Sequence, residues 1–249
     1  MAGCAGAREG DLVAEGGRGV EGRAAQAEGA KRGGGGEPSG EGSGWREVFP
    51  WVRVHAGTRE VEVEGIVPID AHDARTPIVY LEVVACRLDT KEHESLVMTR
   101  ALGSHVHAAL VLMGHEPGAP GSWTWDGAVM EAHPPSGDVL EVRLVTWEED
   151  GTERTASPNE WIVNERTGER PSFEWVFAGS RMVTRQGREG YDADGTGLVV
   201  GLTTFGSEVV ACREVISHES QVQAPEWIAD ARVVPRFGTR AAVRVGPSR

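Results

Sequence analysis

One short pattern occurs twice in this chain and constrains its fold more than any other feature. Residues 83–87 and 209–213 both read Val-Val-Ala-Cys-Arg, and each is followed within a few residues by His-Glu-Ser, at 93–95 and 218–220. Self-similarity of this kind is typical of a duplicated supersecondary unit. We therefore expect two related halves that pack about a pseudo-twofold axis.

The first 44 residues differ in composition from the rest of the chain. They hold 15 of the 34 glycines, and all eight tryptophans lie at or after Trp45. Such a segment buries too little apolar surface to offset the entropy lost on ordering. We predict a disordered Gly/Ala/Glu-rich tether over residues 1–44 and a folded domain over 45–249. The two related halves of that domain would span about 45–165 and 172–249.

Strand patterns dominate the folded part. Residues 59–66 and 139–147 alternate polar and apolar side chains, as half-buried strands do, and 78–86 is an almost continuous apolar run. An Asp-Gly pair at 150–151 predicts a hairpin turn after the second of these. Further strands are expected at 173–177, 198–204, 209–212 and 242–245.

Helical signals are few. Residues 104–113 form the best candidate, with Ser104 as N-cap and Gly114 as the stop. Residues 157–161 carry Ser, Pro and Glu in a capping-box arrangement, and 225–229 open a third short helix. The predicted fold class is mainly β or α+β, a duplicated, pseudo-twofold β-rich domain with a few short helices.

The charge of the chain excludes two classes of partner. The net charge is −13, and residues 45–249 carry 20 basic and 31 acidic side chains. Nucleic acid binding needs clustered Lys and Arg, so no nucleic acid partner is expected. Electrostatic adhesion to anionic lipid is disfavoured for the same reason. Contact with a membrane would then be made only through a lipid anchor.

The three cysteines suggest two modifications. Cys86 and Cys212 occupy equivalent positions of the repeat, and they could form a disulfide if their Cα atoms lie within about 7 Å. Two buried free thiols are the alternative. Cys4 follows Ala-Gly, which resembles the lipidation site of a bacterial lipoprotein without its apolar leader. If a leader precedes the given start, the protein is a periplasmic or envelope lipoprotein; if the sequence is complete as given, it is cytoplasmic.

A histidine and glutamate cluster in the first half is the candidate metal site. His93 and Glu94 follow an apolar strand pattern, and His105 and His107 open the predicted helix. Imidazoles and carboxylates at such ends can converge on a divalent metal ion. Against this, positions i and i+2 of a helix point about 200° apart, so the two helical histidines do not share a face. The alternative is a structural role in both halves, because residues 218–219 repeat the His-Glu pair.

Two other segments could bind a ligand. Trp123 and Trp125 lie in a loop rich in Gly and Pro, where they either contact a ligand or close the end of a sheet. Residues 192–197 begin like a calcium loop, but Thr occupies the fifth and twelfth positions, at Thr196 and Thr203. A hairpin turn rich in Asp and Gly is therefore the favoured interpretation of this segment.

Several motifs, in order, resemble those of the YdjY-like domain of bacterial envelope-type proteins. The resemblance spans about residues 58–246 and implies secretion or lipid anchoring, but it transfers no catalytic residue. The motifs are Thr-Lys-Glu-His-Glu-Ser (90–95), His-Val-His-Ala-Ala-Leu (105–110), Gly-His-Glu-Pro-Gly (114–118), Pro-Pro-Ser-Gly (134–137), Asn-Glu-Trp-Ile (159–162) and Trp-Val-Phe-Ala-Gly-Ser (175–180).

Together these features predict an extracytoplasmic binding or scaffold domain whose partner is a protein or an envelope polymer. The alternative is a metal-dependent hydrolase using the histidine and glutamate cluster. The two differ in geometry. Convergence of three of those side chains in a pocket favours the enzyme, and separate, backbone-bonded histidines favour the binding domain.

Overall fold

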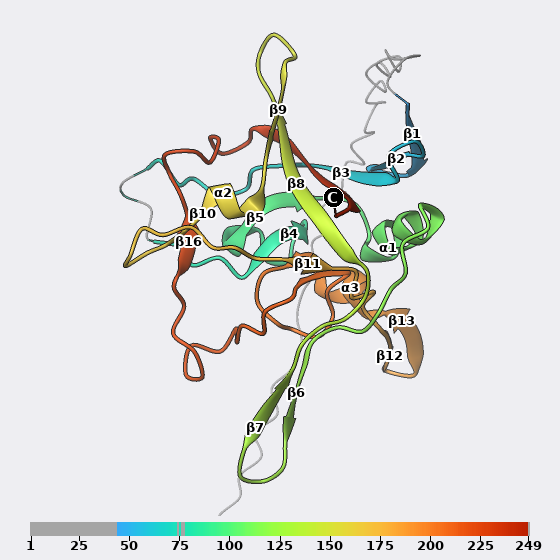
Figure 1. The fold of residues 1–249 in the computed structure, drawn as a ribbon, viewed down its shortest axis with the longest axis vertical. Helices are drawn as coiled ribbons and strands as arrows, with labels where there is room; N and C mark the ends of the chain where they lie inside the picture. Colours follow the sequence, from blue (N-terminus) through green and yellow to red (C-terminus); the bar gives the residue numbers. More distant parts are fainter. Residues whose placement is uncertain (1–43, 74, 76–77, 249) are drawn as a thin grey trace, which may run out of the picture. The chain divides into compact units, whose positions relative to one another are not determined.

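A sheet that closes on itself organises the computed structural model, which describes residues 44–73, 75 and 78–248. Its ring strands are β3 (Glu60–Ile66), β17 (Arg240–Pro247), β8 (Val139–Trp147), β11 (Trp175–Val176), β15 (Val210–Cys212), β14 (Leu198–Gly201), β4 (Val83–Arg87) and β5 (Ser95–Thr99), in that order. Pairing of β5 with β3 closes the ring (Figure 1). The strands β1 (Trp45–Phe49) and β2 (Val52–His55) extend the sheet from β3, and β9 (Glu153–Ala156) pairs with β8.

Three two-stranded sheets, which we call ribbons, and four short helices complete the described part of the chain. The ribbons are β6 (Ser122–Trp125) with β7 (Met130–His133), β10 (Ile162–Asn164) with β16 (Trp227–Ala229), and β12 (Met182–Arg185) with β13 (Arg188–Tyr191). The helices are the 3-10 turn η1 (Glu92–Glu94) and the α-helices α1 (Gly103–Leu112), α2 (Pro158–Trp161) and α3 (Asp192–Thr196). In Figure 1 the β6–β7 hairpin projects from the ring as an arm.

The long strands place apolar side chains on the face that forms the core and charged side chains on the opposite face. Along β17, Val243 and Val245 are fully buried in the main apolar cluster, while Arg244 between them points to the opposite face. There its guanidinium contacts Glu62 Oε2 at 2.6 Å and Glu153 Oε1 at 2.8 Å. Glu62 has no solvent exposure, and Arg53 contacts its other carboxylate oxygen, so two arginines compensate this buried charge.

The sequence predicted the strongly patterned elements well. The strand expected at 139–147 is β8, and the capping box of α2 forms, with the Glu160 carboxylate accepting from Ser157 N–H at 2.7 Å. The β-rich class with few helices is confirmed. The helix expected at 104–113 is α1, which begins one residue earlier with Leu102, not Ser104, as N-cap.

Two local predictions are wrong, and a third is confirmed only in part. Residues 225–229 contain strand β16 instead of a helix, because they pair with β10. Residues 192–196 form helix α3 instead of a hairpin turn, and Gly197 ends it with a φ of +78°. The long strand expected at 78–86 is shortened to β4.

The two copies of the repeat lie in the same sheet. β4 and β15 flank β14, which is antiparallel to the first and parallel to the second, so the two repeat strands run in opposite directions. Parallel β5 follows β4, whereas the described residues 213–226 contain no strand. Strands of the two halves are also interleaved in the ring, because β17 of the second half lies between β3 and β8 of the first. The duplication therefore stays a prediction from sequence.

Both described cysteines are free and buried. Cys86 pairs across the sheet with Leu198, and Cys212 pairs with Trp175 on the far side of β14. The disulfide suggested by the repeat is absent from the structure, which has the two buried thiols of the alternative interpretation, because β14 lies between the two strands. Burial raises the pKa of Cys86, and it raises that of Cys212 to about 12.

Two sequence expectations lie outside the described residues. These are the lipidated Cys4 and, apart from Gly44, the tether. In the part of the chain that the structure does describe, no helix has the length and apolar character to cross a membrane.

Candidate functional site

The two His-Glu-Ser segments meet at one cavity. This cavity has a volume of about 420 Å³, and we call it the His-Glu-Ser cavity. His93 and Glu94 of the first segment line it beside Glu82, and His218 and Ser220 of the second line it from the facing loop. Its remaining wall is mostly apolar and includes Ile78, Val79, Leu81, Ile216, Pro225 and Trp227.

Two carboxyl groups on the polar side of this cavity share a lysine that does not itself line it. The Lys91 ammonium donates to Glu82 Oε2 and, at 3.2 Å, to Glu94 Oε2. Burial raises the pKa of Glu82, and its hydrogen bond with Glu94 adds to this although Lys91 opposes it. Burial also acts to raise the pKa of Glu94, but the bond from Glu82 and the charge of Lys91 outweigh it and lower that pKa. Glu82 therefore holds a proton more readily than Glu94 does, and can donate it to the Glu94 carboxylate.

An aromatic pair joins the lysine to the second histidine. The rings of Phe205 and His218 stack with centroids 4.4 Å apart, and the Lys91 ammonium lies 4.7 Å from the centre of the Phe205 ring. His218 Nδ1 lies 3.2 Å from the backbone oxygen of Thr204. The ammonium is thus held by carboxylates on one side and by a ring face on the other.

A buried carboxylate orders the turn that presents Phe205. Glu208 has no solvent exposure, and it accepts hydrogen bonds from the backbone N–H groups of Phe205 and of Gly206, the latter at 3.1 Å. Burial raises the pKa of Glu208 against the opposing effect of these backbone donors. Glu208 therefore acts on the cavity indirectly, through the position of Phe205.

The four predicted metal ligands do not converge. His93 is exposed over 71% of its side chain, and its Nε2 lies 3.7 Å from Glu94 Oε1. The ring of His105 stacks on Phe49 at 4.7 Å, on the β1 side of α1. His107, two residues further along the helix, points away from Phe49 and towards Gly179, as the helical spacing requires.

The surroundings of His107 are those of a structural residue. Its Nδ1 lies 3.1 Å from the Gly179 oxygen and 2.9 Å from the Tyr191 hydroxyl, and burial lowers its pKa. Among the residues that the structure describes, no three His, Cys, Asp or Glu side chains are grouped as metal ligands. The divalent metal suggested by sequence therefore has no ligand set in this part of the chain.

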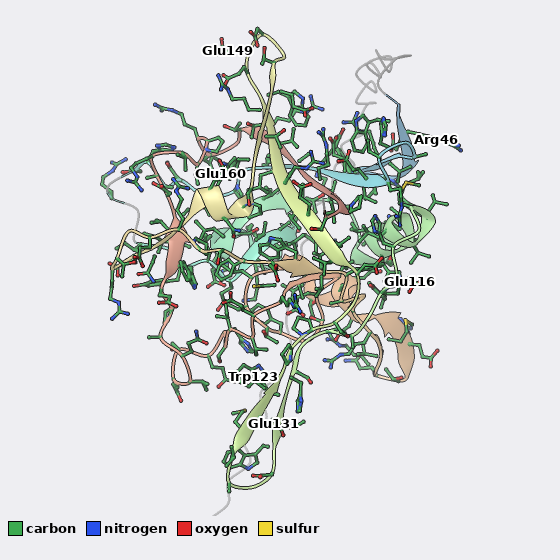
Figure 2. The ribbon with its side chains drawn as sticks, viewed as in Figure 1. Arg46, Glu116, Trp123, Glu131, Glu149 and Glu160 are labelled. Atoms are coloured by element: carbon green, nitrogen blue, oxygen red, sulfur yellow. The ribbon has the colours of Figure 1, made fainter. Side chains whose placement is uncertain are left out.

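The two candidate tryptophans lie on the β6–β7 arm, where Figure 2 labels Trp123 and, on the neighbouring strand, Glu131. Trp123 is partly buried, whereas Trp125 is 62% exposed. Neither lines the His-Glu-Ser cavity. The sequence did not identify Glu82, Lys91 and Phe205 as site residues, although the repeated His-Glu pair was a signal that pointed to their surroundings.

Comparison with known proteins gives one match. A protein-family model described as YdjY domain matches residues 52–246, which include every residue of the His-Glu-Ser cavity. No curated protein and no solved structure matches the chain.

Proposed function

This chain belongs to the YdjY domain family, and we propose that it is a binding domain whose ligand occupies the His-Glu-Ser cavity. The observation that carries the proposal is the meeting of both His-Glu-Ser segments at one apolar cavity with a polar side. Cavities of this size and lining are typical ligand sites. The scattered histidines, several of which contact backbone oxygens, also support binding over metal-dependent hydrolysis.

The lining favours a ligand that is both apolar and basic. Three carboxyl groups, of Glu82, Glu94 and Glu226, line the cavity together with two histidines, and none of the lining residues is Lys or Arg. Lys91 contacts Glu82 and Glu94 without lining the cavity, and its single positive charge offsets only part of this negative charge. A peptide segment with a basic side chain beside an aliphatic one matches both properties, because its aliphatic part would bury apolar surface and its cation would meet the carboxylates.

The proposed partner is therefore a protein rather than an anionic envelope polymer, which these carboxylates would repel. The envelope location, the scaffold role and the lipid tether through Cys4 remain proposals from the sequence. A protein partner in the same compartment is consistent with them.

A peptide array tests this function. The full chain, its Glu94→Gln variant and a Glu149→Gln control would be incubated with immobilised random heptapeptides. Glu149 lies in the turn between β8 and β9 and does not line the cavity (Figure 2). We expect the wild-type chain and the control to select peptides with Lys or Arg next to Leu or Ile, and Glu94→Gln to lose that preference. Selection of acidic peptides, or the same selection by all three proteins, would refute the proposal.

A further inference from the structure

Strand β3 has a fork along one of its edges. One edge pairs with β17 over Val61–Ile66. The other edge pairs first with β2, over residues 60–63, and then with β5, at residues 65–66. Glu64 lies where β2 and β5 part, and its N–H donates to the Trp51 oxygen at 3.0 Å. Because two strands diverge there, a space opens between them.

That space is a second cavity of about 420 Å³, which we call the fork cavity. Its wall is apolar, formed by Ile66, Leu88, Met98 and the indole of Trp51. The volume lies within the range of small-molecule sites. It shares no lining residue with the His-Glu-Ser cavity, so it is an independent candidate.

The charge of the fork cavity is opposite to that of the chain. Two guanidinium groups, of Arg100 and Arg240, and one carboxylate, of Glu64, line it, although the whole chain has a net charge of −13. Arg240 Nη2 lies 3.7 Å from Glu64 Oε1, so these two charges form an ion pair. Arg100 has no carboxylate partner among the described residues, and its guanidinium lies 5.7 Å from the centre of the Trp51 ring. One cation therefore remains available to an anionic ligand.

Trp51 is held in an unfavourable backbone conformation. Its φ is +68°, in the left-handed region that favours glycine or asparagine, and its side chain is 43% exposed. A bulky residue gains little from packing at such a position, so burial does not account for its presence. Strain of this kind is characteristic of residues that serve a site.

We infer that the fork cavity binds a small amphipathic carboxylate, with an aromatic or alkyl body against Trp51 and Met98 and the carboxylate at Arg100. Guanidinium groups recognise carboxylates through paired, charge-assisted hydrogen bonds. The apolar wall excludes water from the body of the ligand and so favours acids with an apolar body over small hydrophilic ones. This site is separate from the peptide-binding function proposed above.

Calorimetric titration of the full chain with 2-naphthoate, decanoate and the uncharged 2-naphthamide tests the inference. Three variants accompany the wild type: Arg100→Gln, Trp51→Gly and the control Arg188→Gln, which changes an exposed arginine of β13 outside the cavity. We expect saturable binding of both acids at about millimolar or lower concentration, and about tenfold weaker binding of the amide.

The variants separate a ligand site from a structural role. Arg100→Gln and Trp51→Gly should each weaken 2-naphthoate binding about tenfold, and Arg188→Gln should leave it unchanged. Trp51→Gly should also keep or raise the melting temperature, because glycine adopts a positive φ without strain. The inference is overturned if the wild type binds neither acid, if the amide binds as tightly as 2-naphthoate, or if Trp51→Gly lowers the melting temperature while binding persists.

Discussion

The Gly118 and Gly137 backbones meet where the base of the β6–β7 arm joins the ring. Gly118 N–H donates to the Phe177 oxygen at 2.9 Å, and Phe177 N–H donates to the Asp138 oxygen at 2.9 Å. A Cβ atom on Gly137, whose φ is +130°, would lie 2.0 Å from the Phe177 oxygen and 2.8 Å from the Gly118 nitrogen. We therefore predict that Gly137→Ala is strongly destabilising.

The expected magnitude follows from three costs. The positive φ costs an alanine about 1 kcal/mol. The clash is with backbone atoms, which no rotamer change relieves, and forced overpacking costs about 1–3 kcal/mol. Separation of the strands also breaks the Gly118–Phe177 hydrogen bond, for about 1–3 kcal/mol more. The total is about 3–7 kcal/mol, or a fall of at least ~6 °C in melting temperature for a domain of this size.

Gly127→Ala is the matched control. Gly127 lies in the turn of the arm with a φ of +100° and has nothing within 4 Å of an added Cβ, so it carries only the conformational cost of about 1 kcal/mol. Urea unfolding followed by tryptophan fluorescence, with calorimetry, measures both variants. Equal losses of unfolding free energy in Gly137→Ala and Gly127→Ala would refute the reasoning, because the backbone contact would then contribute nothing.

Three further predictions concern buried groups. Burial raises the pKa of Glu208 above its ordinary value of 4.5, so its stabilising contribution is complete below pH 4.5 and is lost as pH rises through the folded-state pKa. Glu208→Gln should therefore gain unfolding free energy relative to wild type as pH rises above 4.5, and a constant difference in urea titrations would contradict this. Cys86 and Cys212 should both be unreactive towards a thiol reagent in the native protein and both reactive after denaturation without reductant, whereas an oxidised pair would add no reactive thiol. Arg244→Ala leaves the fully buried Glu62 carboxylate with Arg53 as its remaining cation, and the lost charge-assisted hydrogen bonds should cost about 1–3 kcal/mol in urea unfolding. Its exposed counterpart Arg154→Ala should cost less than about 1 kcal/mol, and similar losses in the two would show that burial of the ion pair is unimportant.

The candidate site was only partly predictable. His93 and Glu94 stood out because their pattern recurs at residues 218–219, and both copies do reach the same cavity. The metal hypothesis added His105 and His107, which are close in sequence but point to different neighbours across the fold. Nearness along the chain could not reveal that Lys91 would contact Phe205, because the contact depends on a turn more than 100 residues away.

The sequence alone determined the features that depend on neighbours along the chain. Residues 139–147 form a strand because their alternation places one apolar face inward, and α2 begins at Pro158 because Ser157 and Glu160 satisfy its first backbone N–H groups. Tertiary structure decided the rest. Residues 225–229 contain a strand because β10 is beside them, Cys86 and Cys212 stay apart because β14 lies between their strands, and the ring closes because β3 offers one edge to both β2 and β5. Hydrogen bonds between distant strands outweigh local propensity, which is a weak preference, and they therefore decide where the two cavities form.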